Sequence, residues 1–257
     1  LAGTSAPDAL RPIRLSIGEP QHASPAFIHE ALIANFAGLT AYPATQGSKD
    51  LRESIARWLE RRYGLPAVDA EHEVLPVNGS REALFAFAQA IIDPRSTAPL
   101  VASPNPFYQI YEGAALLAGA RPVFLAQTPA KGFALDFARI SEEEWSRVEL
   151  MYVCSPGNPT GRVLSLDEWR TLFEKADRYD FVIASDECYS EIYFDEDNPP
   201  LGALEAAYKL GRSGWKNLVV FSSLSKRSNV PGLRSGFVAG DPDLLARFLL
   251  YRTYHGC

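Results

Sequence analysis

An apolar run predicts a buried strand, and a lysine and an arginine follow just past the point where that strand should end. The run LVVF is followed at residues 222–236 by SSLSKRSNVPGLRSG, which contains Lys226 and Arg234. Most lysines are solvated, and that remains the ordinary alternative. At the mouth of a sheet, desolvation and the neighbouring arginine would favour the neutral amine, which can act as a nucleophile or a base.

The segment NGSRE at residues 78–82 would pass from a strand into a helix. Backbone N–H groups of Gly79, Ser80 and Arg81 at a helix N-terminus would form an anion site, although ordinary helix capping explains the same residues. Further groups suited to a phosphate dianion come from the lysine segment: Ser223, Ser225 and Arg234. Neither G-x-x-x-x-G-K-[ST] nor a strand-linked G-x-G-x-x-G is present, so the phosphate would not belong to ATP or NAD.

A carboxylate, a phenol and an amide follow other apolar runs. Asp186 ends the run FVIAS, and a partly buried carboxylate there needs a cationic partner, although a helix cap or a structural ion pair would also explain it. Tyr189 follows three residues later, and Asn158 lies in SPGNPTG, where it could simply be a turn residue. A reactive lysine, a phosphate site and a carboxylate able to hold a protonated ring nitrogen together describe a pyridoxal phosphate pocket.

The elements that must position these residues alternate between short apolar runs and helical periodicities, which is typical of an α/β domain. A helix is predicted from Ser48 to Tyr63, with Ser48 as N-cap and Gly64 ending it. Capping boxes are predicted at Ser141 with Glu144 and at Ser165 with Glu168. Further helices are expected at 81–92, near 106–118, at 165–179 and at 201–210. Strands are expected within 73–80, 99–104, 121–126, 149–156, 181–187, 217–223 and 236–241.

Most of these strands are continuously apolar, which predicts a sheet covered on both faces. Ligands of such sheets lie beyond the carboxyl ends of the strands, where nearly all the polar residues named above fall. A helical run that starts near Asp241 reaches the chain end without a stop signal. We therefore expect the sequence to be part of a longer chain.

Composition limits the partners. The 257 residues carry a net charge of −6, which argues against a nucleic-acid or anionic-membrane partner, and no apolar run approaches the ~18 residues of a membrane span. Cysteines number three, at 154, 188 and 257, without the spacing of a metal site. They indicate reduced thiols in a cytoplasmic protein, and no metal is predicted.

Six motifs occur in order: YPATQG, NGSREALF, SPNPFYQIY, SPGNPTG, SDECYSEIY and SLSKRSNVPGLRSG. With them the sequence resembles the fold-type I, class I/II pyridoxal-phosphate aminotransferases over essentially its whole length. The segments SLSKRSNVPGLRSGFVAGD and LLYRTYHG are most similar in sequence to bacterial N-succinyldiaminopimelate aminotransferases. The resemblance implies transfer of an amino group between N-succinyl-LL-2,6-diaminopimelate and 2-oxoglutarate.

The resemblance also implies a fold: a three-layer αβα sandwich around a mostly parallel seven-stranded sheet. Residues 35–257 would form this large, cofactor-binding domain, and residues 1–34 would be an N-terminal piece of a small domain. The C-terminal small domain, which carries the family's substrate-carboxylate arginine, would be missing from this chain. Activity of the chain by itself is therefore left open.

The resemblance assigns roles to residues. Lys226 would bind the cofactor's aldehyde as a Schiff base and later carry the proton, Asp186 would keep the pyridine nitrogen protonated, and Tyr189 with Asn158 would contact the ring 3′-oxygen. Tyr108 would stack on the ring, with Phe107 as the register alternative. The phosphate would be held by Ser80, Arg81, Ser223 and Arg234, with Gly79 allowing close approach and Ser225 as a further donor. Gly18, with Asn158, would adjoin the substrate, and Tyr42 would reach the phosphate of a neighbouring subunit, which implies a homodimer.

Other functions are compatible with these features. Another class I/II aminotransferase of the aspartate, aromatic or alanine type, or a β-eliminating C–S lyase on the same scaffold, would use the same cofactor set. A cofactor-sensing regulator would need a DNA-binding module, and no basic helix-turn-helix segment is found in the sequence. Product analysis separates transamination from elimination, which releases free ammonia.

Overall fold

The computed structural model describes residue 13 and residues 17–255. Of the predicted N-terminal segment 1–34, residues 1–12 and 14–16 lie outside the described residues. The third cysteine, Cys257, also lies outside them.

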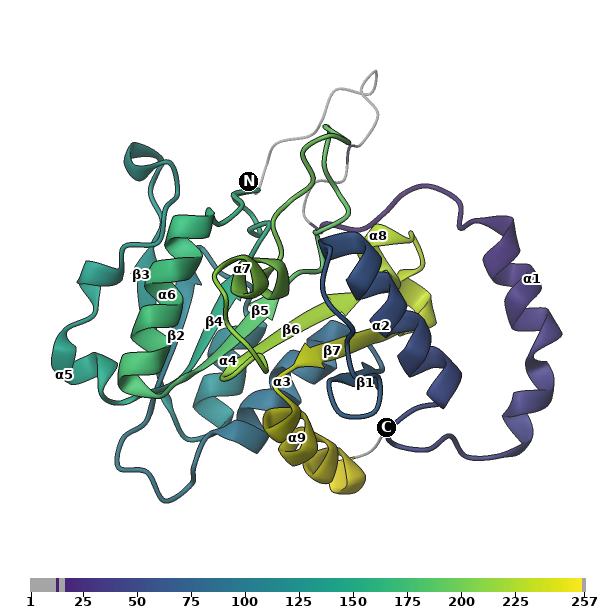
Figure 1. The fold of residues 1–257 in the computed structure, drawn as a ribbon, viewed down its shortest axis with the longest axis horizontal. Helices are drawn as coiled ribbons and strands as arrows, with labels where there is room; N and C mark the ends of the chain where they lie inside the picture. The colour runs from purple at the N-terminus through teal and green to yellow at the C-terminus, as the bar shows by residue number, and fades with distance from the viewer. Residues whose placement is uncertain (1–12, 14–16, 256–257) are drawn as a thin grey trace, which may run out of the picture.

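A seven-stranded sheet forms the centre of the protein (Figure 1). The strands lie in the order β1-β7-β6-β5-β4-β2-β3. All pairs between β6 and β3 are parallel, whereas β7 runs antiparallel to both of its neighbours, β1 and β6. The prediction of a mostly parallel seven-stranded sheet is thereby confirmed. The strand bounds are β1 Val74–Val77, β2 Leu100–Asn105, β3 Arg121–Ala126, β4 Val148–Cys154, β5 Val182–Asp186, β6 Leu218–Ser223 and β7 Gly236–Gly240.

Helices cover both faces of the sheet and bury a separate apolar core on each. One core contains side chains of α3, α4 and α9, and the other contains side chains of α2, α5, α6 and α7. Alternate residues of β6 point into the two cores, Leu218 into one and Val219 into the other, so the continuously apolar strands follow from double coverage. The helix bounds are α2 Lys49–Tyr63, α3 Ser80–Ile91, α4 Ile110–Leu117, α5 Glu142–Trp145, α6 Leu166–Tyr179, α7 Ala203–Lys209, α8 Leu224–Arg227 and α9 Pro242–His255.

The predicted caps of α2, α5 and α6 agree with the structure. Ser48 accepts a hydrogen bond from the Leu51 backbone N–H, and Gly64 ends α2 in the left-handed conformation at φ 59°. Both predicted capping boxes form, at the starts of α5 and α6. Short polar side chains and a glycine satisfy the free backbone groups of these helix ends, which is why local sequence predicts them.

The helix expected near 106–118 is shorter than predicted. The structure begins α4 at Ile110, because the preceding residues pack as an irregular segment. Phe107 stacks on Phe124 with ring centroids 4.8 Å apart, and Tyr108 packs edge-on against Tyr111 at 5.9 Å. These two aromatic contacts fix residues 107 and 108 outside the helix.

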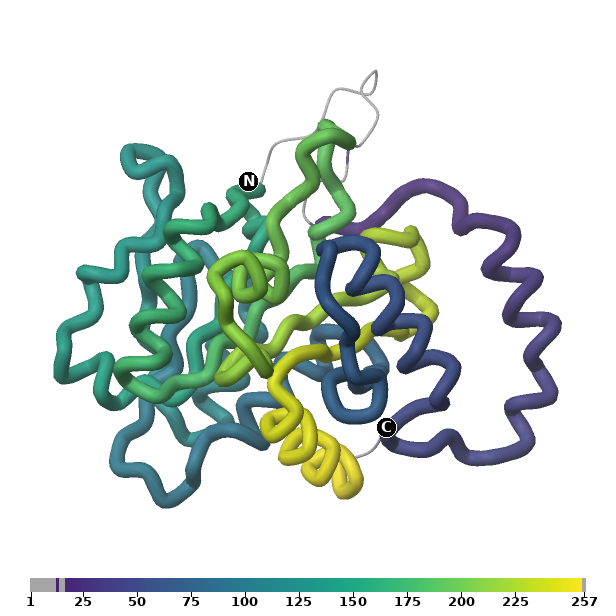
Figure 2. Tube along the Cα trace, viewed as in Figure 1, coloured from purple at the N-terminus to yellow at the C-terminus, as the bar shows by residue number. Residues whose placement is uncertain are grey.

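An exposed apolar arm precedes α2. It consists of α1 (Ala26–Ala34) and the 3-10 helix η1 (Phe36–Thr40), neither of which buries a residue. The tube in Figure 2 shows the arm looping away from the sheet before the chain returns to α2. Phe27 is 68% exposed and Leu39 is 83% exposed. A contiguous exposed apolar surface of this kind is unusual on a monomeric protein.

Glu187 is a buried carboxylate that joins three elements beside the end of β5. It accepts hydrogen bonds from the Tyr63 hydroxyl of α2 at 3.1 Å, from Ser185 Oγ at 3.0 Å and from the Ala203 backbone N–H of α7 at 2.7 Å. No ion pair formed by the described residues includes it. Burial raises the pKa of Glu187 to about 7. The residue therefore fixes the turn after Asp186 through hydrogen bonds rather than through charge.

Glu187 should make stability depend on pH. Between its unfolded pKa of 4.5 and about 7, the folded protein keeps a proton that the unfolded chain loses, so the unfolding free energy should fall by about 3 kcal/mol as pH rises through this range. Glu187→Gln should remove this fall. Denaturant unfolding of both proteins at about pH 5 and about pH 8 measures the difference. Glu53→Gln, which removes a half-exposed carboxylate of α2 paired with Lys49 and Arg57, is the control; an equal change in that variant would contradict the assignment.

Among the described residues, no helix combines the length and apolarity that a membrane crossing requires.

Candidate active site

Most of the predicted site residues lie at one edge of the sheet, on four strands that are direct neighbours. Segments 78–81, 186–189 and 223–226 follow the carboxyl ends of β1, β5 and β6, and Arg234 precedes β7, which runs in the opposite direction. Because β7 is antiparallel, its amino end lies at the same edge as the carboxyl ends of the others (Figure 1). The topology thus brings together residues that are far apart in the sequence.

Asp186 is a buried carboxylate at the end of β5, 5% exposed. Its Oδ2 accepts a hydrogen bond of 2.8 Å from the Tyr111 hydroxyl, and its Oδ1 accepts one of 3.2 Å from the Cys188 backbone N–H. Burial raises the pKa of Asp186, and the hydrogen bonds oppose that rise. No ion pair among the described residues includes this carboxylate. A buried carboxylate held in this way can accept a cationic group from a ligand.

Cys188 connects the carboxylate to the start of α3. Its thiol donates to the Ser80 hydroxyl, with Sγ and Oγ 2.9 Å apart. Burial raises the pKa of the thiol, and the Asp186 charge raises it further. The cysteine is therefore a neutral hydrogen-bonding group that places Ser80 next to the Asp186 turn.

An aromatic pair lies between Arg81 and Asp186. Arg81 Nε donates to the Tyr108 hydroxyl at 2.6 Å, and the Tyr108 ring meets the Tyr111 ring edge-on. Phe107 is instead stacked on Phe124 of β3. Of the two aromatics considered for contact with a ring, Tyr108 is thus the one that adjoins the other site residues.

Gly79 and Arg234 approach each other closely. A Cβ added to Gly79 would lie 2.1 Å from Arg234 Nη2, and the glycine has φ +102°, a conformation that side chains rarely adopt. Arg234 is itself left-handed at φ 53° and pairs with Glu82 at 2.7 Å. The guanidinium is therefore held beside the N-terminus of α3 by an acidic residue that the sequence analysis did not single out.

Lys226 lies in the short helix α8, and its Nζ contacts the Gly18 carbonyl oxygen. A Cβ on Gly18 would lie 3.5 Å from the Tyr189 hydroxyl, so these three residues share one region. The pKa of Tyr189 is raised to about 12, first by burial and then by the Asp186 charge. The lysine, the tyrosine and the aspartate are in this way part of one cluster.

The structure connects Ser223, Ser225 and Tyr42 less directly to the other predicted site residues. Ser223 is buried and accepts a hydrogen bond from the Ser225 backbone N–H at 2.9 Å, so it caps the lysine helix. Leu224 N donates to the Ser235 carbonyl at 3.0 Å, which ties this turn to the residue after Arg234. Tyr42 is fully exposed on the chain that follows the arm. The structure does not bring Tyr42 to the other candidates within this chain.

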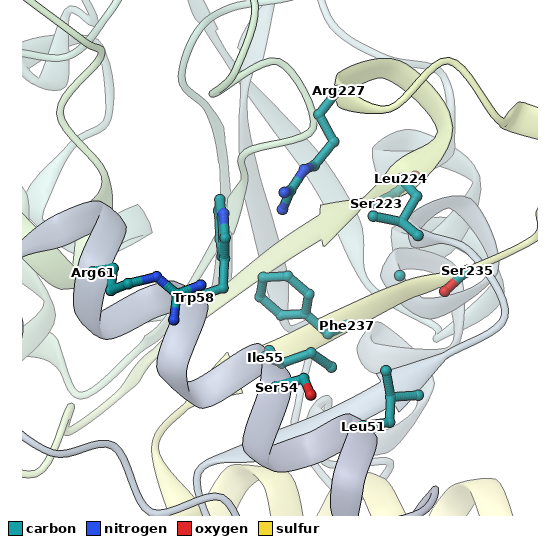
Figure 3. A pocket seen from close by; sticks show the side chains of 11 residues that line it. Leu51, Ser54, Ile55, Trp58, Arg61, Ser223, Leu224, Arg227, Ser235 and Phe237 are labelled. Carbon is teal, nitrogen blue, oxygen red and sulfur yellow. The ribbon is translucent and has the colours of Figure 1, made fainter. Parts of the chain in front are cut away.

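A hollow of about 270 Å³ lies between α2 and the β6–β7 edge. Figure 3 shows the Trp58 ring facing the Arg227 side chain across it, and the Arg227 Cζ atom is 4.2 Å from the ring centroid. Burial lowers the pKa of Arg227. Of the predicted site residues, Ser223 alone is in the described lining of this hollow, so the hollow adjoins the candidate site and is distinct from it.

Comparison with known proteins decides the family. The family described as "Aminotransferase class I and II" matches residues 11–251. The chain belongs to the class I and II aminotransferases.

Two kinds of relative support this membership. A crystal structure of an aminotransferase from Neisseria meningitidis Z2491 is 56% identical with a TM-score of 0.95, and the match covers 99% of this chain and 64% of that one. The LL-diaminopimelate aminotransferase of Nitratidesulfovibrio vulgaris (strain DP4) is 35% identical over 91% of this chain and 58% of that protein. A structure described as a probable N-succinyldiaminopimelate aminotransferase from Thermus thermophilus is 27% identical, with a TM-score of 0.83, and covers 94% of this chain and 63% of that one. The chain thus spans about three fifths of the length of these aminotransferases.

Class I and II aminotransferases use pyridoxal 5′-phosphate, and the residues present fit its functional groups. A buried carboxylate without a cationic partner among the described residues matches a protonated pyridine nitrogen, and an amine matches an aldehyde. The free N–H groups at the start of α3, with Arg234 beside them, match a phosphate.

Sequence reasoning missed three residues of this candidate site. Tyr111 was in a quoted motif but received no role, Cys188 was counted only as a thiol, and Glu82 was not singled out. Tyr111 lies three residues after Tyr108, and Cys188 two residues after Asp186, so proximity along the chain was a usable signal. For the Glu82–Arg234 pair no local signal exists, because its members come from different strand ends.

Proposed function

We propose that the protein is a pyridoxal-phosphate-dependent aminotransferase that moves an amino group between an amino acid and a 2-oxo acid. The observation that carries this proposal is the buried Asp186 carboxylate, which is held by a phenol and a backbone N–H and has no cationic partner among the described residues. A buried charge without a counter-ion is costly. A cofactor with a protonated ring nitrogen would supply the missing positive charge.

We infer how the chain would hold the cofactor. Asp186 would bind the ring nitrogen, Tyr108 would lie against the ring, and Tyr189 with Asn158 would bind the ring oxygen. The phosphate would lie at the N-terminus of α3, with donors from Ser80, Arg81, Ser223, Ser225 and Arg234. For Arg234 to bind it fully, the guanidinium would have to share or exchange its contact with Glu82.

The bound cofactor supplies an electron sink for the bonds at the substrate's α-carbon. In the mechanism that we propose, Lys226 would hold the cofactor's aldehyde, and its amine, when free, would move a proton at the substrate's α-carbon as general base and acid. Its Nζ now contacts the Gly18 carbonyl, so the amine would turn from that carbonyl toward the cofactor. Gly18 and Asn158 would adjoin the substrate.

The substrate that we propose is a diaminopimelate derivative, with glutamate and 2-oxoglutarate as the second pair. Relatives named for LL-diaminopimelate and for N-succinyldiaminopimelate both match the chain. The sequence pattern favours the N-succinyl form, whereas the more similar curated relatives are named for the free form. Assaying both compounds as amino donors separates them.

We also propose a homodimer with a shared site, located in the cytoplasm. The apolar arm and the fully exposed Tyr42 support an interface with a second copy, because their side chains have little cover within this chain. Tyr42 would reach the phosphate bound by the partner subunit.

Spectroscopy of the purified full-length protein tests the proposed function. Bound pyridoxal phosphate should give a visible absorbance band, and a true amino donor should bleach it by forming pyridoxamine phosphate. Adding 2-oxoglutarate should then restore the band and produce glutamate. Release of free ammonia in place of a recoverable aminated cofactor would contradict transamination and indicate elimination.

A further inference from the structure

Tyr111 lies behind the carboxylate that is proposed to bind the cofactor. It is the second residue of α4 and is 1% exposed. Its hydroxyl donates to Asp186 Oδ2 at 2.8 Å. The ring is fixed on two sides, stacked on Tyr152 with centroids 4.7 Å apart and met edge-on by Tyr108 at 5.9 Å. The phenol is therefore held in one orientation, in which its hydroxyl donates a hydrogen bond to Asp186.

Among the described residues, the titratable groups that face Asp186 are acids that are neutral near pH 7. They are Tyr111 from α4, Cys154 from β4, and Cys188 and Tyr189 from the turn after β5. Burial raises the pKa of each of them, and that of Tyr189 reaches about 12. The ionised form of Asp186 therefore depends on hydrogen bonds, of which the bond from the Tyr111 hydroxyl is the shortest that we find.

We propose that Tyr111 is a positioning residue, which holds Asp186 ionised and turned toward the cofactor's ring nitrogen. The inference rests on the proposed function and extends it to a residue that does not itself touch the cofactor. Because Tyr111 bonds one carboxylate oxygen, the carboxyl plane cannot rotate freely. Because a hydrogen bond to a charged acceptor is stronger than one to a neutral acceptor, it favours the ionised carboxylate.

The chain offers a matched control in Tyr152. This tyrosine is also fully buried and belongs to the same stacked pair, but its hydroxyl donates to the Leu84 carbonyl at 2.7 Å and not to Asp186. Tyr111→Phe and Tyr152→Phe each remove one buried hydroxyl. A purely structural contribution should appear in both variants, whereas an effect through Asp186 should appear in Tyr111→Phe alone.

Two measurements on the full-length protein test the inference. In Tyr111→Phe, the affinity for pyridoxal phosphate should fall by roughly 10- to 100-fold near pH 7. In the cofactor-free protein, the pH at which Asp186 protonates should rise, by about one unit or more. The infrared band of the protonated carboxyl, assigned by its absence in Asp186→Asn, follows that protonation. Tyr152→Phe should match the wild type in both measurements.

The outcomes separate this inference from the proposed function. If Tyr111→Phe leaves both the affinity and the protonation of Asp186 unchanged, or if Tyr152→Phe changes them equally, the positioning role is wrong. If the wild type itself does not bind pyridoxal phosphate, the proposed function is wrong, and a role for Tyr111 in cofactor binding fails with it. Rescue is also informative, because Tyr111→His retains a donor and should recover part of the affinity if the hydrogen bond is the cause.

Discussion

Replacing Lys226 by alanine is expected to abolish transamination while leaving part of the noncovalent cofactor binding intact. The variant removes the one amine that we place beside the site, at the contact between α8 and the Gly18 carbonyl. It loses the group that we propose to hold the aldehyde and to act as general base, so kcat should fall on the order of 10⁴-fold or more. The phosphate and ring-nitrogen contacts do not involve this side chain, and they should retain the cofactor reversibly.

Borohydride reduction and peptide mapping measure the covalent part directly. In the wild type, the pyridoxyl group should be found on Lys226, and in Lys226→Ala no lysine should carry it. Lys209→Ala, which removes an exposed lysine paired with Glu205 on α7, is the control and should behave as the wild type. Full turnover in Lys226→Ala, or a pyridoxyl group on a different lysine, would contradict the assignment.

The second large effect is expected for Asp186→Asn. The change removes the buried negative charge but retains a side chain that can accept from Tyr111 or the Cys188 N–H. Without that charge, the ring nitrogen would lose its counter-ion, and kcat should fall on the order of 10²- to 10³-fold. The cofactor-free protein should not be destabilised by loss of an ion pair, because Asp186 has no cationic partner among the described residues.

Comparison of two adjacent carboxylates sharpens the test. Asp186 and Glu187 are both buried, but Glu187 bonds Tyr63 and the start of α7, away from the Asp186 side of the turn. Asp186→Asn should therefore impair turnover with little effect on unfolding, whereas Glu187→Gln should alter the pH dependence of unfolding with little effect on turnover. Denaturation curves and steady-state rates of both variants measure this. The reverse pattern would show that the wrong carboxylate has been placed in the site.

Local sequence predicted much of the fold because the relevant forces are local. The strands could be predicted because coverage of both faces of the sheet makes them continuously apolar. The starts of α2, α5 and α6 could be predicted because Ser48, Ser141 and Ser165 cap their own helices. The antiparallel direction of β7 could not be predicted from the sequence. It depends on which strands pair, and the apolar run before Asp241 is the same in either direction.

The candidate site was predictable to the extent that its residues follow strand ends. Lys226, Asp186 and the NGSRE segment could be placed because parallel strands deliver their carboxyl ends to one edge. The contacts between them could not, since Ser80 meets Cys188, and Arg234 meets Glu82, only after the sheet has formed. Stacking on Phe124 occupies Phe107 and leaves Tyr108 beside the site, a choice that sequence spacing left open.

The contact between Gly79 and Arg234 limits which substitutions residue 79 can accept during evolution. A Cβ at residue 79 would lie 2.1 Å from Arg234 Nη2, so the end of this flexible side chain would have to move away. While the arginine is under selection, that displacement disfavours a side chain at residue 79. Even after the arginine is lost, the φ of +102° continues to disfavour every other amino acid there. In descendants of this gene, the glycine should therefore be the later of the two to disappear.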